Sequence, residues 1–242
     1  MDPRRSELQN VFQNAGLILS AEQEKLFLRY AEMLEDWNSR MNLTAITDFS
    51  EVVRKHFLDS CAPLYASSVP VGKTLLDVGS GAGFPGIPLK IMLPDTEIVL
   101  LDSLRKRIGF LEDVTAELGL KNVRAVHGRA EDLARDPGFR EHFDTVTARA
   151  VAPLPVLAEY CVPFVKLKGR FLAYKSGNIT QEMADAEKAL GLLGAGNTKA
   201  ESFVLPGTDM ERSLIWAEKK RKTPAAYPRR AGSVKKNPLG GK

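Results

Sequence analysis

Residues 75–89 read LLDVGSGAGFPGIPL, and this stretch decides the fold. A short apolar run ends at Gly79, and two further glycines follow at Gly81 and Gly83. Glycine adopts positive φ at no steric cost and lets the backbone approach a ligand closely. The stretch therefore predicts a strand, a ligand-binding turn and the start of a helix, the unit from which doubly wound α/β sheets are built.

Short apolar runs alternate with helical segments along the rest of the chain. The sequence predicts strands at 74–78, 97–102, 122–128, 143–149, 169–175, 202–205 and 213–219, and helices at about 86–93, 104–118, 154–165 and 180–192. This alternation is typical of a mostly parallel sheet between two layers of helices. Only about eight residues join the last two strands, too few for a parallel crossover. The last strand should therefore run antiparallel, as in the class I S-adenosylmethionine-dependent methyltransferase fold.

Three regions differ in composition. Residues 1–70 are predicted to be a helical region, in which Ser20 and Gln23 can form a capping box before an amphipathic run. Residues 71–218 hold the alternating strands and helices of the Rossmann-like domain. Residues 219–242 form a basic C-terminal tail.

The tail carries nine Lys and Arg residues and no acidic residue. Residues 1–218 have 25 basic and 30 acidic residues, a net charge of −5. The Pro, Gly and Lys content of the tail predicts a segment that is extended or disordered when free. Such a segment suits a polyanionic partner, nucleic acid or a membrane surface, and the alternative is a solvated segment with no partner.

Composition excludes several classes of protein. Apolar residues make up 44% and charged residues 26% of the 242, as in ordinary globular proteins. The chain has no run of 18 apolar residues, and its first ten residues lack the apolar core of a signal peptide, so we expect a cytoplasmic protein. Cys61 and Cys161 are isolated and the three histidines lack ligand spacing, so neither a disulfide framework nor a metal site is expected.

Two nucleotide cofactors compete for the glycine turn. Gly81, Gly83 and Gly86 satisfy the GxGxxG pattern of dinucleotide sites, although many glycine loops do so by chance. Asp77 favours S-adenosylmethionine, because a carboxylate repels a pyrophosphate and attracts a sulfonium and an ammonium. Asp102 ends the next strand, where it can accept hydrogen bonds from the ribose of either cofactor. An NAD-dependent oxidoreductase is therefore the alternative.

Longer motifs resemble one family over residues 20–235. The stretches LDVGSGAGFPGIPLKI, LLDSLRKRIGFL, GRAED and FDTVTARAVAPL, preceded by WNSRMNLTAITD and RKHFLDS, resemble the RsmG (GidB) family of 16S ribosomal RNA guanine-N7 methyltransferases. The basic stretch KRKTPAAYPRRAG is similar to the C-terminus of part of that family. The resemblance implies methyl transfer from S-adenosylmethionine to N7 of one guanosine in 16S ribosomal RNA, guanosine 527 by analogy with the family. The substrate would be the RNA itself or the 30S subunit. We expect a monomer with no membrane partner.

Individual residues receive roles from the resemblance and from the glycine turn. Arg149 is the catalytic candidate, placed beside the cofactor and the target base. The expected cofactor contacts are Asp77, Gly79, Gly81, Gly83, Phe84, Asp102, Ser103, Leu104, Ala130, Glu131 and Arg149. An RNA-facing rim is expected from Arg54, Lys55, Arg105, Lys106, Arg107 and Lys175. His56 is expected to cap against Asp59 instead of facing the pocket.

The missing motifs agree with methylation of a ring nitrogen. The stretch ARAVAPL, residues 148–154, stands where enzymes that methylate exocyclic amines usually carry a [DN]PP[YF] loop. Cys161, the type of nucleophile that a pyrimidine C5 methyltransferase needs, lies in a predicted apolar helix and is expected to be inert core. Guanine N7 has a free lone pair, so alignment with the methyl group supplies most of the catalysis. A third interpretation is a non-enzymatic RNA-binding assembly factor with a vestigial cofactor fold.

Overall fold

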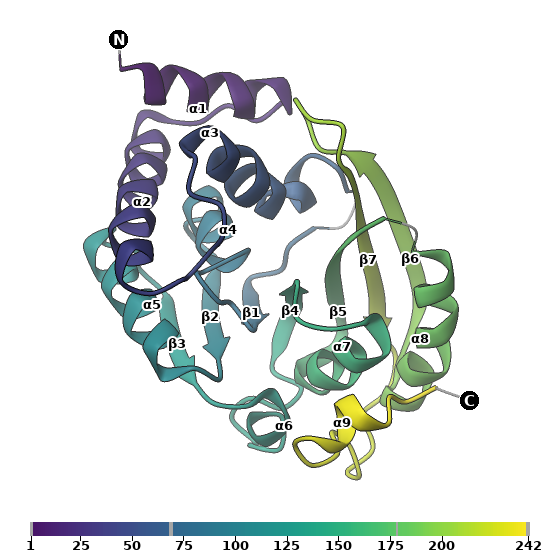
Figure 1. Ribbon diagram of the computed structural model, residues 1–242. Coiled ribbons are helices and arrows are strands. Elements are labelled where there is room, and N and C mark those ends of the chain that lie inside the picture. The colour runs from purple at the N-terminus through teal and green to yellow at the C-terminus, as the bar shows by residue number, and fades with distance from the viewer. Residues whose placement is uncertain (1, 68–69, 178, 241–242) are drawn as a thin grey trace.

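A seven-stranded sheet lies at the centre of the protein, in the order β3-β2-β1-β4-β5-β7-β6 (Figure 1). The computed structural model describes residues 2–67, 70–177 and 179–240. The strands are β1 (Thr74–Val78), β2 (Glu97–Asp102), β3 (Val123–His127), β4 (Phe143–Arg149), β5 (Val165–Ser176), β6 (Ala195–Val204) and β7 (Glu211–Lys219). Strands β1 to β5 pair in parallel, and β7 pairs antiparallel with β5 and β6. The predicted fold class and the reversed last strand are confirmed.

Helices cover both faces of the sheet. They are α1 (Pro3–Asn14), α2 (Ala21–Arg40), α3 (Phe49–Val52), the π-helix η1 (Val53–Leu58), the 3-10 turn η2 (Ala62–Leu64), α4 (Gly86–Met92), α5 (Arg105–Glu117), α6 (Ala130–Leu133), α7 (Leu154–Cys161), the 3-10 turn η3 (Val162–Phe164), α8 (Thr180–Leu193) and α9 (Ser233–Lys236). Helices α1 to α5 pack on one face, and α6 to α9 pack on the other. The predicted capping box forms, because Ser20 accepts from the Gln23 amide and the Gln23 side chain accepts from the Ser20 amide.

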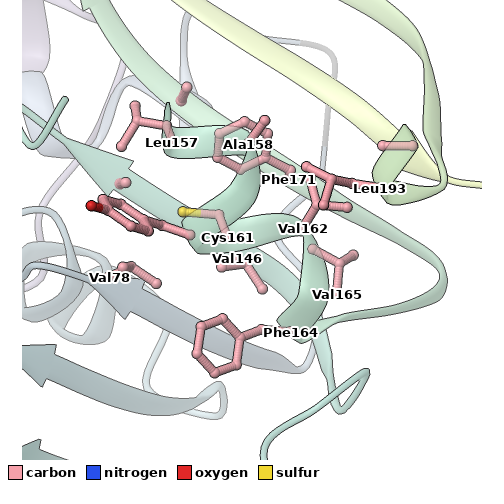
Figure 2. Close-up of a cluster of buried hydrophobic side chains, with 14 of the residues drawn as sticks. Val78, Val146, Leu157, Ala158, Cys161, Val162, Phe164, Val165, Phe171 and Leu193 are labelled. Carbon is pink, nitrogen blue, oxygen red and sulfur yellow. The ribbon is translucent and has the colours of Figure 1, made fainter. Parts of the chain in front are cut away.

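Alternation along the buried strands separates two apolar layers. In β1, Leu75 faces the layer under α2, α4 and α5, while Leu76 faces the layer under α7 and α8. The N-terminal helices share the first layer with the sheet, so they pack as part of the same core. Cys161 lies fully buried in the second layer, among Val146, Leu157 and other apolar side chains (Figure 2). Burial raises the pKa of its thiol well above the ordinary value, which confirms the expected core role.

The basic C-terminal segment packs against the body of the protein. Its described part after β7, residues 220–240, is called the C-terminal strap below. Thr223 and Val234 are buried, and Arg140 donates to the carbonyl oxygens of Thr223 and Tyr227 at 2.8 and 2.9 Å. The prediction of an extended or disordered tail is therefore wrong for these residues, because a few buried contacts offset the unfavourable composition.

At two positions of the turn after β1, only glycine fits the backbone and the space available. Gly79 has φ +75°, and a Cβ there would lie 2.7 Å from a methyl carbon of Val151. Gly83 has φ +94°, and a Cβ there would lie 2.7 Å from the hydroxyl oxygen of Tyr30. That hydroxyl donates to the carbonyl oxygen of Ala82, so α2 is hydrogen-bonded directly to the turn.

The variant Gly83→Ala should destabilise the protein by about 2–4 kcal/mol, because it combines unfavourable φ with a clash against Tyr30. Gly109→Ala is the matched control, since Gly109 lies within α5 and its added Cβ meets no atom within 4 Å. We expect this control to stabilise the helix by about 0.5–1 kcal/mol. Urea unfolding of both variants measures the difference, and equal effects of the two substitutions would contradict the proposed constraint.

Candidate active site

The glycine turn is tied to the neighbouring strand by backbone hydrogen bonds. The amides of Gly79 and Ser80 donate to the carbonyl oxygen of Leu101 in β2, at 2.8 and 3.0 Å. The turn lies where β1 separates β2 from β4, which is the point at which the strand order reverses. Ligands of open α/β sheets bind beyond the strand ends at such a point. The backbone is therefore placed as the sequence predicts for a nucleotide site.

Asp77 supports the turn from beneath. Its side chain is fully buried, and Oδ2 accepts a 3.0 Å hydrogen bond from the amide of Gly86 at the start of α4. Oδ1 has no hydrogen-bond partner among the described residues. Burial, the largest influence, raises the pKa of this carboxyl to about 7. Its position does not support the predicted direct contact with the cofactor, since Asp77 lines neither of the pockets described below.

The start of α4 offers no free amide to a pyrophosphate. Pro85 and Pro88 have no amide proton, Gly86 donates to Asp77, and Ile87 donates to the carbonyl oxygen of Gly83 at 2.8 Å. Dinucleotide sites rely on amides at this position to hold the phosphates. The local geometry therefore disfavours the NAD alternative, although GxGxxG is present in the sequence.

A first pocket of about 210 Å³ lies beyond the ends of β1, β2 and β3. It is lined by Val78, Gly79, Leu101, Asp102, Ser103, Gly128, Arg129, Ala130, Glu131, Val151, Tyr160, Gly232 and Lys235. Five predicted cofactor contacts are in this set: Gly79, Asp102, Ser103, Ala130 and Glu131. Leu104 does not line the pocket and instead forms the N-cap of α5. We call this cavity the adenosine pocket.

Asp102 has most of its hydrogen-bonding capacity in use. Oδ1 accepts from the Leu104 amide at 2.9 Å, and Oδ2 accepts from the Gly81 amide at 2.9 Å and from Arg107 at 3.3 Å. A carboxylate offers about four acceptor positions, so one is free, and the Arg107 contact is the longest of the three. The carboxylate therefore fits a ribose whose hydroxyls take the free position and displace Arg107, and Gly81 contributes by holding this group in place.

A second pocket of about 430 Å³ lies beyond the ends of β4 and β5. It is lined by Lys55, His56, Asp59, Arg149, Ala150, Tyr174, Lys175, Ser176, Glu182 and Arg212. Its size is in the range of small-molecule sites. Ala150 lines this pocket and Val151 lines the adenosine pocket, so the two cavities are neighbours across the segment after β4. We call it the acceptor pocket.

Arg149 is held in a fixed position between the helical region and the sheet. Its guanidinium donates to Asp59 at 2.8 Å and to the carbonyl oxygen of Lys55 at 3.2 Å. It also lies 5.0 Å from the ring centre of Phe84, the residue that follows Gly83 in the turn. Asp59 accepts a second bond from Arg212 at 3.1 Å. Arg149 therefore connects the glycine turn to a charged network in the acceptor pocket.

His56 faces the acceptor pocket, so the predicted cap against Asp59 is wrong. Its Nδ1 lies 3.3 Å from Arg149, its Nε2 lies 2.8 Å from the hydroxyl of Thr44, and its ring stacks on Phe84 with centres 4.5 Å apart. Burial and the nearby arginine lower the pKa of His56 to about 3. The ring is therefore neutral, with Nδ1 accepting from Arg149 and Nε2 donating to Thr44, because a guanidinium can only donate.

The predicted RNA rim is distributed over separate surfaces. Lys55 and Lys175 line the acceptor pocket, paired with Glu51 and Glu182 at 2.5 Å. The residues of α5 lie beside the adenosine pocket: Arg105 is near His127, Lys106 is exposed, and Arg107 contacts Asp102. Arg54 pairs with Glu7 of α1 and does not line either pocket. A role of these residues in RNA binding stays a prediction.

Among the pocket residues that the sequence did not predict, four come from elements far from the glycine turn. Arg212 reaches the acceptor pocket from β7, and Tyr160 reaches the adenosine pocket from α7. Gly232 and Lys235 come from the strap. A single sequence does not place any of them at the site, since they lie far along the chain from the glycine turn.

Two absences can be stated for the described parts of the chain. Residues 2–67, 70–177 and 179–240 contain no group of three or more His, Cys, Asp or Glu side chains placed to hold a metal ion. Within the same ranges, every helix is too short or too polar to cross a lipid bilayer.

The sheet order, the reversed last strand and the turn after β1 define a class I methyltransferase fold. Solved structures with this fold include an O-methyltransferase from Bacillus cereus in complex with SAH, with a TM-score of 0.53 and 16% sequence identity over 79% of this chain and 91% of that one. The model of the GidB family, described as rRNA small subunit methyltransferase G, matches residues 23–214. The chain belongs to this family.

Curated relatives extend the similarity to almost the whole chain. The ribosomal RNA small subunit methyltransferase G of Lachnoclostridium phytofermentans is 52% identical over 224 residues, covering 93% of each chain. The protein of the same name from Geobacillus thermodenitrificans is 47% identical over 234 residues, 97% of this chain and 98% of the relative. The resemblance seen in the motifs is thus confirmed.

Replacing Asp77 with Asn should change how stability depends on pH. The pKa of this carboxyl is about 7 in the folded protein and 3.8 in the unfolded chain. Between these two pH values, the folded protein therefore binds more protons than the unfolded chain. Its contribution to stability is therefore full below about pH 4 and is lost as the pH rises through 7. The free energy of unfolding of wild type relative to Asp77→Asn should fall by roughly 2–4 kcal/mol from pH 4 to pH 8.

Urea unfolding of both proteins across this range makes the measurement. The opposite titration of His56 is common to both proteins and cancels in the difference. Asp36→Asn is the control, since Asp36 is exposed and pairs with Arg40 on the surface of α2. A constant difference between wild type and Asp77→Asn at every pH would show that the buried carboxyl titrates normally.

Proposed function

We propose that the protein transfers a methyl group from S-adenosylmethionine to N7 of a guanosine in small-subunit ribosomal RNA, as a monomer in the cytoplasm. Family membership supports the substrate class. The observation that carries the proposal is the meeting of two pockets at residues 149–151, one suited to an adenosine and the other large enough for a base. The cofactor supplies a methyl group bound to a positively charged sulfur, ready for nucleophilic attack.

Every candidate general base among the described lining residues of the acceptor pocket is paired with a cationic side chain. His56 is neutral but bonded through both ring nitrogens, and Asp59 already accepts from Arg149 and Arg212. Glu182 accepts from Lys175 and from the amide of Leu154. Methylation of an amine or a hydroxyl releases a proton that such a base would have to take. Methylation of guanine N7 releases none, so the pocket is better suited to this reaction.

Arg149 would orient the target base without blocking the reacting atom. N7 and O6 of guanine are both acceptors in reach of an arginine, but N7 must keep its lone pair for the methyl group. We therefore assign Arg149 to O6, to a phosphate or to the carboxylate of the cofactor. Because Asp59, His56 and Phe84 fix its guanidinium, little reorganisation would be needed when the base arrives.

Basic residues around the pockets would contact the RNA backbone. Lys106 is exposed beside the adenosine pocket, and Lys55 and Lys175 line the acceptor pocket, where RNA phosphates could replace their present carboxylate partners. Contacts of this kind make binding sensitive to salt. The proposal covers free RNA and the 30S subunit alike, and guanosine 527 stays a prediction from the family.

Replacing Arg149 with Ala should lower the rate of methyl transfer at saturating cofactor by roughly 10–10³-fold, because an oriented donor of the pocket is lost. Arg149→Lys should recover little, since an ammonium cannot reproduce the guanidinium fork that reaches Asp59 and His56. The control is Arg40→Ala, which removes an exposed arginine of α2. Single-turnover transfer of a labelled methyl group makes the measurement, and an unchanged rate with unchanged affinities would remove Arg149 from the site.

Deleting the gene should abolish one N7-methylguanosine in the small-subunit RNA. Mass spectrometry of nuclease fragments from the deletion strain, compared with the parent strain, tests the proposed product directly. Restoring the gene should restore the modification, and restoring it with Arg149→Ala should not. A complete set of N7-methylguanosines in the deletion strain would contradict the proposed function. Protein that retains NAD and not S-adenosylmethionine would support the oxidoreductase alternative.

A further inference from the structure

The C-terminal strap, residues 220–240, is fastened to the body by an ion pair with a buried carboxylate. Glu159 of α7 is completely buried, and the Arg229 guanidinium donates to both of its oxygens at 2.6–3.1 Å. The backbone amide of Arg229 donates to the same carboxylate at 2.7 Å. Breaking a buried pair leaves an uncompensated charge, which is strongly unfavourable. The strap therefore has a defined position on α7.

The same helix connects the strap to the adenosine pocket. Tyr160, the neighbour of Glu159, lines that pocket together with Glu131, one of the predicted cofactor contacts. Burial is the main influence that raises the pKa of Tyr160 to about 12, so its hydroxyl keeps its proton at neutral pH. Within α7, Glu159 thus holds the strap, and its neighbour Tyr160 forms part of the pocket wall.

The end of the strap reaches the pocket itself. Figure 1 shows α9 beside α6 and α7, and α9 contacts α7. Val234 is fully buried in the apolar layer beneath, which holds the short helix down. Gly232 and Lys235, on either side of Val234, line the same pocket as Asp102. The ammonium of Lys235 makes no ion pair with any residue in the described ranges.

The position of Lys235 favours one part of the cofactor. The strap lines the adenosine pocket, and none of its described residues lines the acceptor pocket. A cation would be repelled by the sulfonium and ammonium at the other end of S-adenosylmethionine. The adenosine half carries no charge and offers ring nitrogens and ribose oxygens as acceptors. An ammonium carries three donors that suit such acceptors.

We propose that the C-terminal strap forms a wall of the cofactor site and that Lys235 donates a hydrogen bond to the adenosine half of S-adenosylmethionine. This inference rests on the proposed function. The basic end of the chain then contributes to cofactor binding, although its composition alone indicated a segment that binds a polyanion. The family model ends at residue 214, so this wall lies outside the part of the chain that the model matches.

The test measures binding of S-adenosylhomocysteine to the full-length protein by calorimetry without RNA. Lys235→Ala should weaken binding about tenfold, the size expected for a charge-assisted hydrogen bond. Lys236→Ala is the matched control, because it removes the next lysine of α9, which does not line the pocket. In methyl transfer, Lys235→Ala should raise KM for S-adenosylmethionine and leave KM for RNA unchanged.

A second variant tests the wall as a whole. A chain ending at residue 231 removes α9 and keeps the Arg229–Glu159 pair, and it should bind S-adenosylhomocysteine more weakly than Lys235→Ala does. Wild-type affinity in Lys235→Ala would overturn the proposal, and so would an increase confined to KM for RNA. If the wild-type protein itself fails to bind S-adenosylhomocysteine, the proposed function fails instead, so the two failures can be told apart.

Discussion

The hydrogen bond from the Gly86 amide to the buried Asp77 carboxylate is the constraint on which the site depends. It joins the end of β1 to the start of α4 and so determines the path of the glycine turn between them. A Cβ at Gly86 would collide with Leu100 and lie 2.9 Å from Asp77 Oδ2, so only glycine lets the helix approach this closely. The bond also uses the amide that a pyrophosphate would need. One contact thus shapes the cofactor site and selects against dinucleotides.

The charged side chains of the acceptor pocket are likewise already paired with one another. In the proposed reaction, methyl transfer to N7 moves a positive charge from the cofactor to the base, so the product in the acceptor pocket would be a cation. Asp59 pairs with both Arg149 and Arg212 and compensates them in part, and Glu182 pairs with Lys175. Paired in this way, the basic residues can donate hydrogen bonds to a neutral guanine and repel the methylated product less than free cations would.

The sequence predicted those features that depend on local patterns. The apolar runs at 97–102 and 143–149 coincide with β2 and β4, because buried parallel strands are apolar on both faces. The strand predicted at 202–205 proved to be the longer β6, Ala195–Val204. Its first half alternates half-buried and exposed residues, and its pairing with β7 shifts register there. Short-range hydrophobicity therefore underestimated this edge strand.

Long-range partners explain what the sequence could not predict. His56 is placed by Thr44, Phe84 and Arg149, which come from three separate segments, so no helix-capping rule could locate it. Within the strap, Val234 and Arg229 are the residues that turn a disorder-like composition into a packed segment. The partner of Arg229, Glu159, lies 70 residues away in the sequence. Composition describes a segment by itself and carries no information about a buried carboxylate elsewhere.

The placement of the strap also changes what its charge implies. Some of its cations are engaged with the body, Arg229 with Glu159 and Arg221 with the carbonyl oxygen of Gly191. The exposed ones still create a positive potential beside the adenosine pocket, and such a field can draw RNA toward the protein without contacting it. Salt-dependent RNA binding would therefore be expected whether the strap is a wall of the cofactor site or an RNA-binding arm. Only cofactor affinity distinguishes the two, because a long-range field acts on the polyanion and leaves the binding of S-adenosylhomocysteine, which has no net charge, nearly unaffected.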